Sequence, residues 1–281
     1  MQLLKYSIKS TRISNIFISH LHGDHYFGLI GLLTSLSMKG RNAELHLHAP
    51  SALMDIITAQ LQASDSELSY PLHFHPIEYG QTPKQIWEDA TLTVEAIPLI
   101  HRVPCTGFVF KEKPKPRRVI GENLPQGIPS NKIELLKTGV DVEFDGQVYT
   151  NGYMTLPPKP SRSYAFCTDT RYMPELGEML QGIDLLYHES TYTDRLIDKA
   201  HEFFHSTAMQ AATVAEKAQA GHLLLGHYSI RYGDLKPFVQ EARSIFPHSS
   251  LALDGGNYSL EIVDNQRITL NKTVIPKKRE Y

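Results

Sequence analysis

Four metal-binding side chains stand within six positions near the start of the chain. His20-Leu21-His22-Gly23-Asp24-His25 combines three imidazoles with one carboxylate. Imidazole suits zinc, copper, iron and nickel, and a carboxylate beside it favours zinc or manganese over copper. A catalytic zinc ion usually takes three protein ligands and leaves one position for water. The cluster therefore predicts two neighbouring ions, whose remaining ligands must come from distant parts of the chain.

Three further candidates each follow an apolar run and precede a polar turn. His101 follows residues 97–100, Asp169 follows residues 164–168, and His227 follows residues 223–226. In α/β sheets, ligands bind outside the carboxyl ends of the strands. We expect one edge of a sheet to collect all three with the first cluster. A pair of zinc ions there could hydrolyse a phosphodiester or a strained amide.

The other histidines carry no such pattern. His46-Leu47-His48 and His73-Phe74-His75 show alternate spacing, but no Asp-His follows, so alternation along a strand explains them. We interpret His201, His222 and His248 as surface or satisfied core residues.

Strands and helices alternate over most of the chain, which predicts an α/β layered architecture. The strands are expected at 15–19, 44–49, 91–100, 106–111, 163–168, 184–188, 222–226 and 259–263. The helices are expected at 27–38, 51–63, 207–220 and 235–246. Thr207 and Gln210 form a capping-box start for the third of these helices.

Residues 111–160 break this alternation. The segment is rich in proline, shows no sustained period, and opens with a run of net charge +4 over 111–118. Long irregular segments in compact domains are usually functional or disordered. We interpret 111–160 as an arm inserted into a single domain of residues 1–281, with too little apolar content for a core of its own.

Composition excludes several classes of protein. The 281 residues are 41% hydrophobic, which excludes a disordered chain, and the formal charge of −2 excludes a positive field over the whole molecule. Two cysteines are too few for a disulfide scaffold. The start lacks an apolar signal segment, and no stretch reaches the roughly 20 apolar residues that cross a bilayer. We expect a cytoplasmic protein with no membrane partner.

Several motifs together resemble a known family. The metal motifs are similar in order to those of the metallo-β-lactamase fold, and Ile18 to Leu29 with His205-Ser206-Thr207-Ala208 more closely resembles ribonuclease Z, the endonuclease that trims tRNA 3′ ends. The motifs that carry the broader resemblance are residues 20–25, 101–104, 167–171 and 226–229. The similarity runs from about Ile8 to about Leu260.

The resemblance implies an αββα sandwich, two Zn²⁺ per subunit with Mn²⁺ as an alternative, precursor tRNA as substrate, and a homodimer. It assigns His20, His22 and His101 to one ion and Asp24, His25 and His227 to the other, with Asp169 bridging. It also implies that Asp24 orients or deprotonates water. His205 is the candidate proton donor. Glu189 is expected to orient a metal ligand or His205 by contacting it, without binding the metal itself.

The resemblance gives the basic run at residues 111–118 a possible role in binding tRNA. Phosphates attract Lys and Arg regardless of base sequence, and RNA duplexes are recognised mainly by shape. We expect the opening of the arm to grip the tRNA while its 3′ end enters the cleft. The residues concerned are Lys111, Lys113, Lys115, Arg117 and Arg118.

Two other functions remain open at this point. The start of the chain matches only the end of the helix that leads into the metal strand in the family, which predicts that the first strands of the fold are lacking. A non-catalytic RNA-binding homologue is one alternative, and a hydrolase of a small phosphodiester or lactone, with the arm as a lid, is the other. Metal content separates the first alternative from an enzyme, and cleavage of a 3′-extended precursor tRNA separates the second from a nuclease.

Overall fold

Two β-sheets face each other at the centre of the molecule. The computed structural model describes residues 2–263 and 267–274. The smaller sheet is parallel and consists, in spatial order, of β1 (Asn15–Phe17), β2 (Leu45–Pro50) and β3 (Leu72–Ile77). The larger sheet has the order β14-β13-β12-β11-β6-β5-β4. Its strands are β4 (Lys84–Glu88), β5 (Leu92–Leu99), β6 (Cys105–Glu112), β11 (Ser163–Cys167), β12 (Leu185–Glu189), β13 (His222–Gly226) and β14 (Ser249–Leu251).

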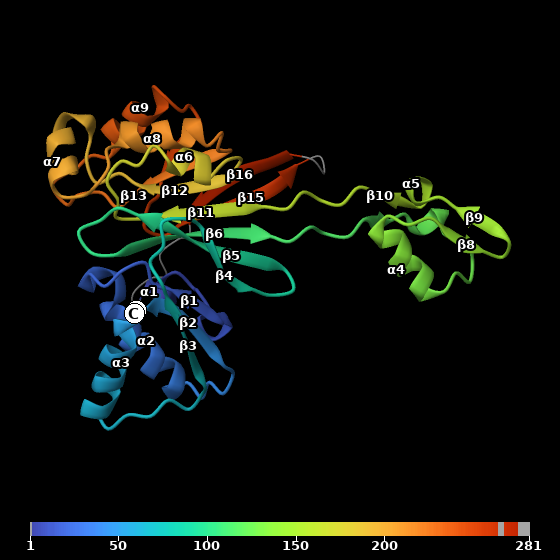
Figure 1. The fold of residues 1–281 in the computed structure, drawn as a ribbon, viewed down its shortest axis with the longest axis horizontal. Helices are drawn as coiled ribbons and strands as arrows, with labels where there is room; N and C mark the ends of the chain where they lie inside the picture. Colours follow the sequence, from blue (N-terminus) through green and yellow to red (C-terminus); the bar gives the residue numbers. More distant parts are fainter. Residues whose placement is uncertain (1, 264–266, 275–281) are drawn as a thin grey trace.

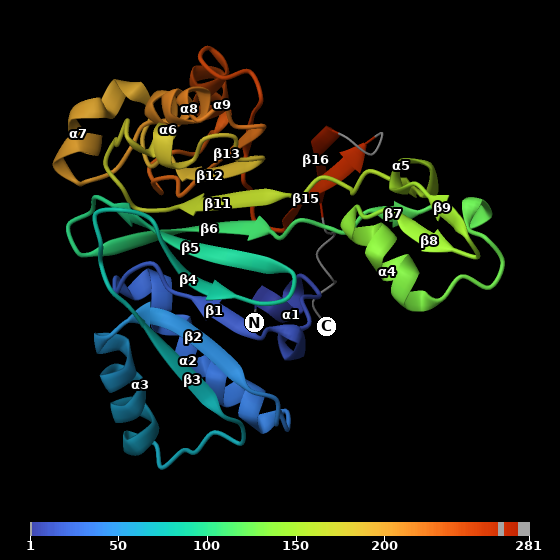
Figure 2. The same cartoon turned by 45° about the vertical axis from the view of Figure 1, so that its right-hand side comes forward.

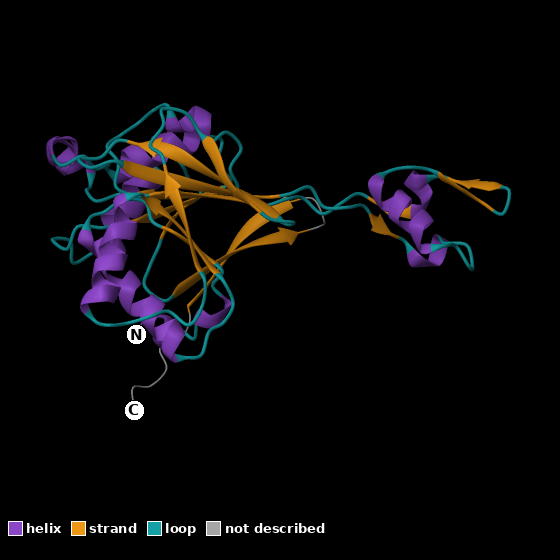
Figure 3. Cartoon of the chain, turned by 60° about the horizontal axis from the view of Figure 1, so that its bottom comes forward, coloured by secondary structure: helices purple, strands orange, loops and turns teal. Residues whose placement is uncertain are grey.

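Helices cover the outer face of each sheet, which gives four layers (Figures 1 and 3). Helices α2 (Gly23–Met38) and α3 (Ala52–Ala63) lie on the smaller sheet. The larger sheet is covered by α6 (Leu176–Met179), α8 (Ala208–Lys217) and α9 (Lys236–Arg243), with α7 (Ile197–Glu202) beside them. The remaining elements of the body are α1 (Gln2–Lys5), η1 (Ser10–Arg12), η3 (Asp194–Leu196), β15 (Gly256–Val263) and β16 (Arg267–Val274). No helix within the described residues is long and apolar enough to span a membrane.

Three hydrophobic clusters correspond to the three interfaces between these layers. Leu33, Leu47 and Leu53 are fully buried between the smaller sheet and its helices. A second cluster around Val94 and Phe108 fills the space between the two sheets. The largest cluster joins the other sheet to α6, α8 and α9. The predicted αββα sandwich is therefore confirmed.

Strand directions bring several strand ends to one edge of the larger sheet. Strands β11 to β14 are parallel, β6 is antiparallel to β11, and β5 is antiparallel to β6. The carboxyl ends of β5, β11, β12 and β13 therefore lie at the same edge. The Thr106 amide donates to the Ser19 carbonyl at 3.0 Å, so the turn after β1 meets this edge too.

The expected elements are present with some shifted bounds. Helix α2 begins at Gly23 rather than at residue 27, so Asp24 and His25 lie in its first turn, where a carboxylate interacts favourably with the helix dipole. The expected capping box of α8 is confirmed, because Thr207 and Gln210 satisfy each other's backbone amides. The expected strands did not include β4, β14 or β16, and the alternation at His73-Phe74-His75 indicated β3 without giving its bounds. The expected lack of initial strands stays a prediction.

Residues between β6 and β11 extend away from the layered body (Figures 1 and 2). The expectation that this segment has no core is wrong, because Leu136, Val142 and Met154 are buried together there. Its elements are β7 (Arg118–Val119), η2 (Gly121–Asn123), α4 (Ser130–Thr138), β8 (Val142–Phe144), β9 (Gln147–Tyr149), α5 (Asn151–Met154) and β10 (Thr155–Leu156). Asp145 and Gly146 both have positive φ and join β8 to β9. Asp-Gly is a strong hairpin signal that the sequence reading missed.

Candidate metal and catalytic site

Asp169 lies at the centre of a cluster of histidines. Its Oδ2 is 3.7 Å from His20 Nε2 and 3.7 Å from His101 Nε2. Its Oδ1 is 3.4 Å from His25 Nε2 and 3.2 Å from His227 Nε2. The two carboxylate oxygens therefore face different pairs of imidazoles, which is the arrangement that a bridging ligand needs.

The first pair belongs to a set with the geometry of a metal site. His22 Nδ1 lies 3.2 Å from both His20 Nε2 and His101 Nε2. Ligands at about 2.0–2.1 Å from a tetrahedral zinc ion are about 3.3 Å apart. One potential ligand atom from each of His20, His22, His101 and Asp169 lies within 4.8 Å of the others. These side chains fit a divalent metal ion.

A second set lies on the other side of Asp169. Ligand atoms of Asp24, His25 and His227 also lie within 4.8 Å of one another, and His25 Nε2 is 3.5 Å from Asp24 Oδ2. The Asp24 side chain is 75% exposed, so its carboxylate lies on the solvent side of the cluster. The structure thus brings together all seven residues that the sequence singled out for metal binding.

Hydrogen bonds behind the rings orient the imidazoles. His101 Nδ1 donates to the Phe204 carbonyl at 3.1 Å, which leaves its Nε2 lone pair facing Asp169 and His22. His227 Nδ1 lies 2.8 Å from Thr191 Oγ1, and His20 Nδ1 lies 3.1 Å from Ser19 Oγ. The sequence reading missed Phe204, Thr191 and Ser19. Only the position of Thr191, two residues after Glu189, gave a local signal.

Burial favours the uncharged form of three imidazoles of the cluster. Burial, followed by the neighbouring His25, lowers the pKa of His20 to about 3. Burial also lowers the pKa values of His25 and His101. For Asp169, burial alone would raise the pKa, but His227 and a hydrogen bond from Thr168 hold it below its usual value. Neutral imidazoles with an ionised carboxylate are the protonation states in which these groups bind metals.

Three residues at the site hold the strained left-handed backbone conformation. Asp169 has φ 27°, His227 has φ 58° and Phe204 has φ 60°. Non-glycine residues adopt such angles at a cost of about 1–3 kcal/mol each, and they concentrate at functional sites. The strain aims two candidate ligands and one orienting carbonyl into the cluster.

His205 stands beside the metal cluster and is held by Glu189. The fully buried Glu189 accepts from His205 Nδ1 through Oε1 at 2.8 Å, and the Thr170 amide donates to the same oxygen. Its Oε2 accepts from the Thr191 amide and hydroxyl. Burial lowers the pKa of His205, but the hydrogen bond to Glu189 together with the charges of Glu189 and Asp169 outweighs it, and the net pKa is raised. The His205 ring centroid is 5.2 Å from that of His101 and 5.3 Å from that of His227.

The basic run lies away from this cluster, and part of its charge is already paired. Lys111 contacts Glu95, Lys113 contacts Glu88, and Lys115 contacts Glu112 at 2.6 Å. Arg117 donates to Thr155 Oγ1, and Arg118 donates to the Pro157 carbonyl. The run therefore binds the two chain segments that lead into the arm to each other and to the body. The net charge of the run in the sequence does not show that three of its lysines are paired with glutamates.

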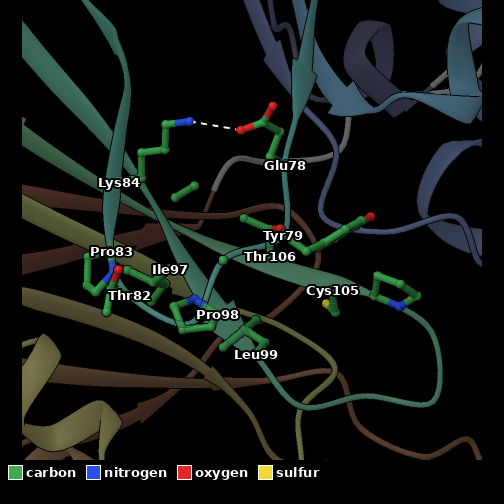
Figure 4. Close-up of a pocket in the computed structure, with 13 residues that line it drawn as sticks. Glu78, Tyr79, Thr82, Pro83, Lys84, Ile97, Pro98, Leu99, Cys105 and Thr106 are labelled. Carbon is green, nitrogen blue, oxygen red and sulfur yellow. Dashed lines mark hydrogen bonds and ion pairs between the residues drawn. The ribbon is translucent and has the colours of Figure 1, made fainter.

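A pocket of about 330 Å³ adjoins the cluster (Figure 4). Leu99, Cys105 and Tyr79 contribute to its wall, and an ion pair between Lys84 and Glu78 lies at one side. Cys105 Sγ is 3.5 Å from His20 Nδ1, so this wall touches the back of a candidate ligand. Burial raises the pKa of the Cys105 thiol, which keeps it protonated.

Known proteins share both the sequence and the fold. A model described as a beta-lactamase superfamily domain matches residues 3–122. Ribonuclease Z of Bacteroides fragilis (strain YCH46) is 42% identical over 254 residues, which are 90% of this chain and 83% of the relative. Ribonuclease Z of Cytophaga hutchinsonii is 44% identical over 238 residues, or 84% of this chain and 76% of the relative.

Solved structures agree with these relatives. The structure of human tRNase Z, short form, superposes with a TM-score of 0.61 at 26% identity, covering 90% of this chain and 81% of that one. A long form RNase Z from yeast has a TM-score of 0.59 at 17% identity, over 90% of this chain and 33% of that one, and shows the fold alone. With two fifths of its residues shared along most of the curated relatives' length, this chain belongs to the ribonuclease Z family.

Proposed function

We propose that the protein is a metal-dependent endoribonuclease that removes the 3′ trailer from precursor tRNA. The observation that carries this proposal is the Asp169 cluster, with His205 beside it, in a chain of the ribonuclease Z family. The cluster supplies a place for metal ions next to a group that can move a proton. Both promote the cleavage of a phosphodiester by water.

The site is proposed to take two zinc ions, with manganese as an alternative. His20, His22 and His101 would hold one ion and Asp24, His25 and His227 the other, with one oxygen of Asp169 on each. When bound, such a pair supplies Lewis acidity toward the phosphodiester and makes a nearby water more acidic. The spacing of His22 from its two neighbours and the division of the Asp169 oxygens support this assignment.

The side chains of the protein would handle the protons. Asp24 presents an exposed carboxylate at the opening, where it can accept a proton from the attacking water. As the new P–O bond forms, the bond to the 3′ oxygen of the upstream nucleotide breaks. His205 would give the Nε2 proton to that oxygen, because its Nδ1 is engaged by Glu189. The products are a tRNA with a free 3′ hydroxyl and a trailer with a 5′ phosphate.

The inserted segment 111–160 is proposed to bind the tRNA outside the site. It carries eight Lys and Arg residues against six Asp and Glu residues. With Lys111, Lys113 and Lys115 paired to carboxylates, the excess charge is small. Recognition of shape by the folded arm is therefore expected to contribute beside the phosphate contacts.

Removal of the arm tests this division of labour. The Glu112 amide donates to the Arg162 carbonyl at 2.9 Å, so residues 114–160 can be replaced by a short Gly-Ser link without disturbing the body. We expect this variant to lose cleavage of a 3′-extended precursor tRNA and to keep hydrolysis of bis(p-nitrophenyl) phosphate. Equal loss of both activities would contradict the proposed role.

Asp24→Asn tests the site itself. This variant should fold normally and lose both activities, since the carboxylate acts on water in either reaction. Full turnover of precursor tRNA by Asp24→Asn would refute the assignment. An active intact chain that prefers the small phosphodiester to precursor tRNA would favour the alternative of a small-molecule hydrolase.

A homodimer and a cytoplasmic location complete the proposal. Cys105 and Cys167 are free and buried, which suits a reducing compartment. Light scattering during gel filtration would measure the mass of the assembly. A mass equal to that of one chain would overturn the dimer.

A further inference from the structure

A second group of histidines lies at the other end of the smaller sheet. His46 and His48 belong to β2, and His73 and His75 belong to β3. The parallel register pairs His46 with His73 and His48 with His75. Because His46 also pairs with Asn15 at the start of β1, the His46–His73 pair lies opposite the end from which the chain enters the metal cluster. The alternate spacing in the sequence thus becomes a two-by-two grid of imidazoles on one face.

A single carboxylate contacts the outer pair of the grid. Glu44 Oε2 is 3.2 Å from His73 Nε2, and Glu44 Oε1 is 3.6 Å from His46 Nε2. The side chains of His73 and Glu44 are 47% and 64% exposed, whereas that of His46 is 16% exposed. Solvent ions can therefore reach this half of the grid from outside.

The inner pair, His48 and His75, contacts the outer pair on its buried side. His46 Nδ1 lies 3.0 Å from His75 Nε2, and the His46 ring also packs on Trp87 with centroids 4.6 Å apart. If His46 donates from Nδ1, its Nε2 lone pair faces Glu44. Buried His48 donates from Nε2 to Asn15 Oδ1 at 3.2 Å, and its Nδ1 has no hydrogen-bond partner within the described part of the chain.

Imidazole nitrogens beside a carboxylate are a ligand set that borderline divalent ions prefer.

We propose that His46 Nε2, His73 Nε2 and Glu44 bind a divalent transition ion of the zinc type at a site separate from the catalytic cluster. The His46 and His73 rings are stacked with centroids 5.0 Å apart. Binding requires the exposed His73 ring to rotate so that its Nε2 joins His46 Nε2 on the ion. His75 fixes the His46 ring through Nδ1, as partners behind metal-binding histidines usually do.

Metal counting on the full chain tests this site. Wild-type protein, His73→Asn and Glu44→Gln are dialysed against the same buffered free Zn²⁺, and bound zinc per chain is measured by mass spectrometry. We expect both variants to bind one ion fewer than the wild type and to keep their catalytic rate on precursor tRNA. His248→Asn, which removes an exposed histidine elsewhere, is the matched control and should bind as many ions as the wild type.

Copper spectroscopy gives a second readout that does not depend on activity. Cu²⁺ added to wild type that holds zinc at the catalytic cluster and none at the second site should show an EPR signal with splitting from two imidazole nitrogens, and His73→Asn should reduce this to one. Circular dichroism checks that each variant is folded. Equal zinc content in the wild type and both variants, or an unchanged copper signal in His73→Asn, would overturn the second site while leaving the proposed nuclease activity intact.

Discussion

Two buried carboxylates organise the site at the scale of single residues. Asp169 divides its two oxygens between two sets of imidazoles, and Glu189 divides its own between His205 and Thr191. A carboxylate that is 0% exposed keeps its charge only if hydrogen bonds replace water. Burial would raise the pKa of Glu189, but the hydrogen bond and charge of His205, with His227 and the Thr191 hydroxyl, hold it below its usual value.

The proposed role of His205 as proton donor can be tested through the leaving group. His205→Gln should lower kcat on precursor tRNA by roughly 10²–10⁴-fold, because the departing 3′ oxygen is strongly basic and needs a proton. Hydrolysis of bis(p-nitrophenyl) phosphate should fall far less, because nitrophenolate leaves without one. Rates on both substrates and the metal content of the variant are the measurements. An equal loss on both substrates would instead indicate damage to the metal cluster.

At the scale of elements, close packing at strand ends positions the site. Gly226 ends β13 directly before His227. A Cβ atom at Gly226 would stand 2.2 Å from Tyr187 Oη and 2.4 Å from its ring. The absence of a side chain there therefore allows β12 and β13 to bring His227 and Glu189 to the same edge.

This close approach predicts a stability defect. Gly226→Ala should destabilise the protein by about 1–3 kcal/mol, because the new methyl group overlaps a ring that is itself packed against Phe166. The free energy of unfolding from urea titration is the measurement. Adding Tyr187→Ala should make the Gly226→Ala change much less costly, and strictly additive losses would argue against the steric cause.

The base of the arm depends on a second element-scale contact. Glu112 on β6 accepts from the Arg162 guanidinium, and Lys115 also pairs with it. The hydrogen bond from Arg162 is the main cause that lowers the pKa of Glu112 to about 2, from an ordinary 4.5. The pair therefore stabilises the fold fully above pH 4.5, and this contribution is lost as the pH falls toward 2.

Glu112→Gln should remove that pH dependence. The variant is expected to lose up to about 1 kcal/mol at pH 7, since the Arg162 side chain is 42% exposed and solvent screens the pair. Between pH 4.5 and 2 the difference from the wild type should shrink toward zero. Urea midpoints measured at each pH would check this, and a difference that grows on acidification would contradict it.

At the scale of the whole molecule, the candidate metal cluster draws its residues from both halves of the sandwich. His20, His22 and His25 follow the smaller sheet, whereas His101, Asp169 and His227 follow strands of the larger one. A cation shared by these groups would link the layers in the folded chain and not in the unfolded one. Ligands that bind only the folded state raise its stability.

Metal removal should therefore lower the stability of the folded protein. Treatment with a chelator is expected to abolish cleavage of precursor tRNA and to lower the melting temperature by several degrees, since a ligand at 100 times its Kd contributes about 2.7 kcal/mol. Readdition of Zn²⁺ should restore both. Calorimetry with and without chelator measures the shift, and an unchanged melting temperature after complete metal loss would refute the link between the layers.

The sequence alone determined which residues could meet and the order in which they occur. His20 to His25 lie in one short segment, and His101, Asp169 and His227 each directly follow an apolar strand. Periodicity and local spacing are properties of neighbouring residues, so they can be read without a structure. The αββα architecture was predicted from the family resemblance. The expectation that Glu189 orients a ligand or His205 also came from the sequence.

Only the tertiary structure decided how these groups face one another. The division of the Asp169 oxygens, the contacts of Thr191 and the small core of the arm depend on segments that are far apart in the chain. The same holds for the histidine grid, because the register of β2 against β3 places His46 beside His73. Strand register and long-range packing arise from the whole fold, and a local pattern in the sequence does not contain them.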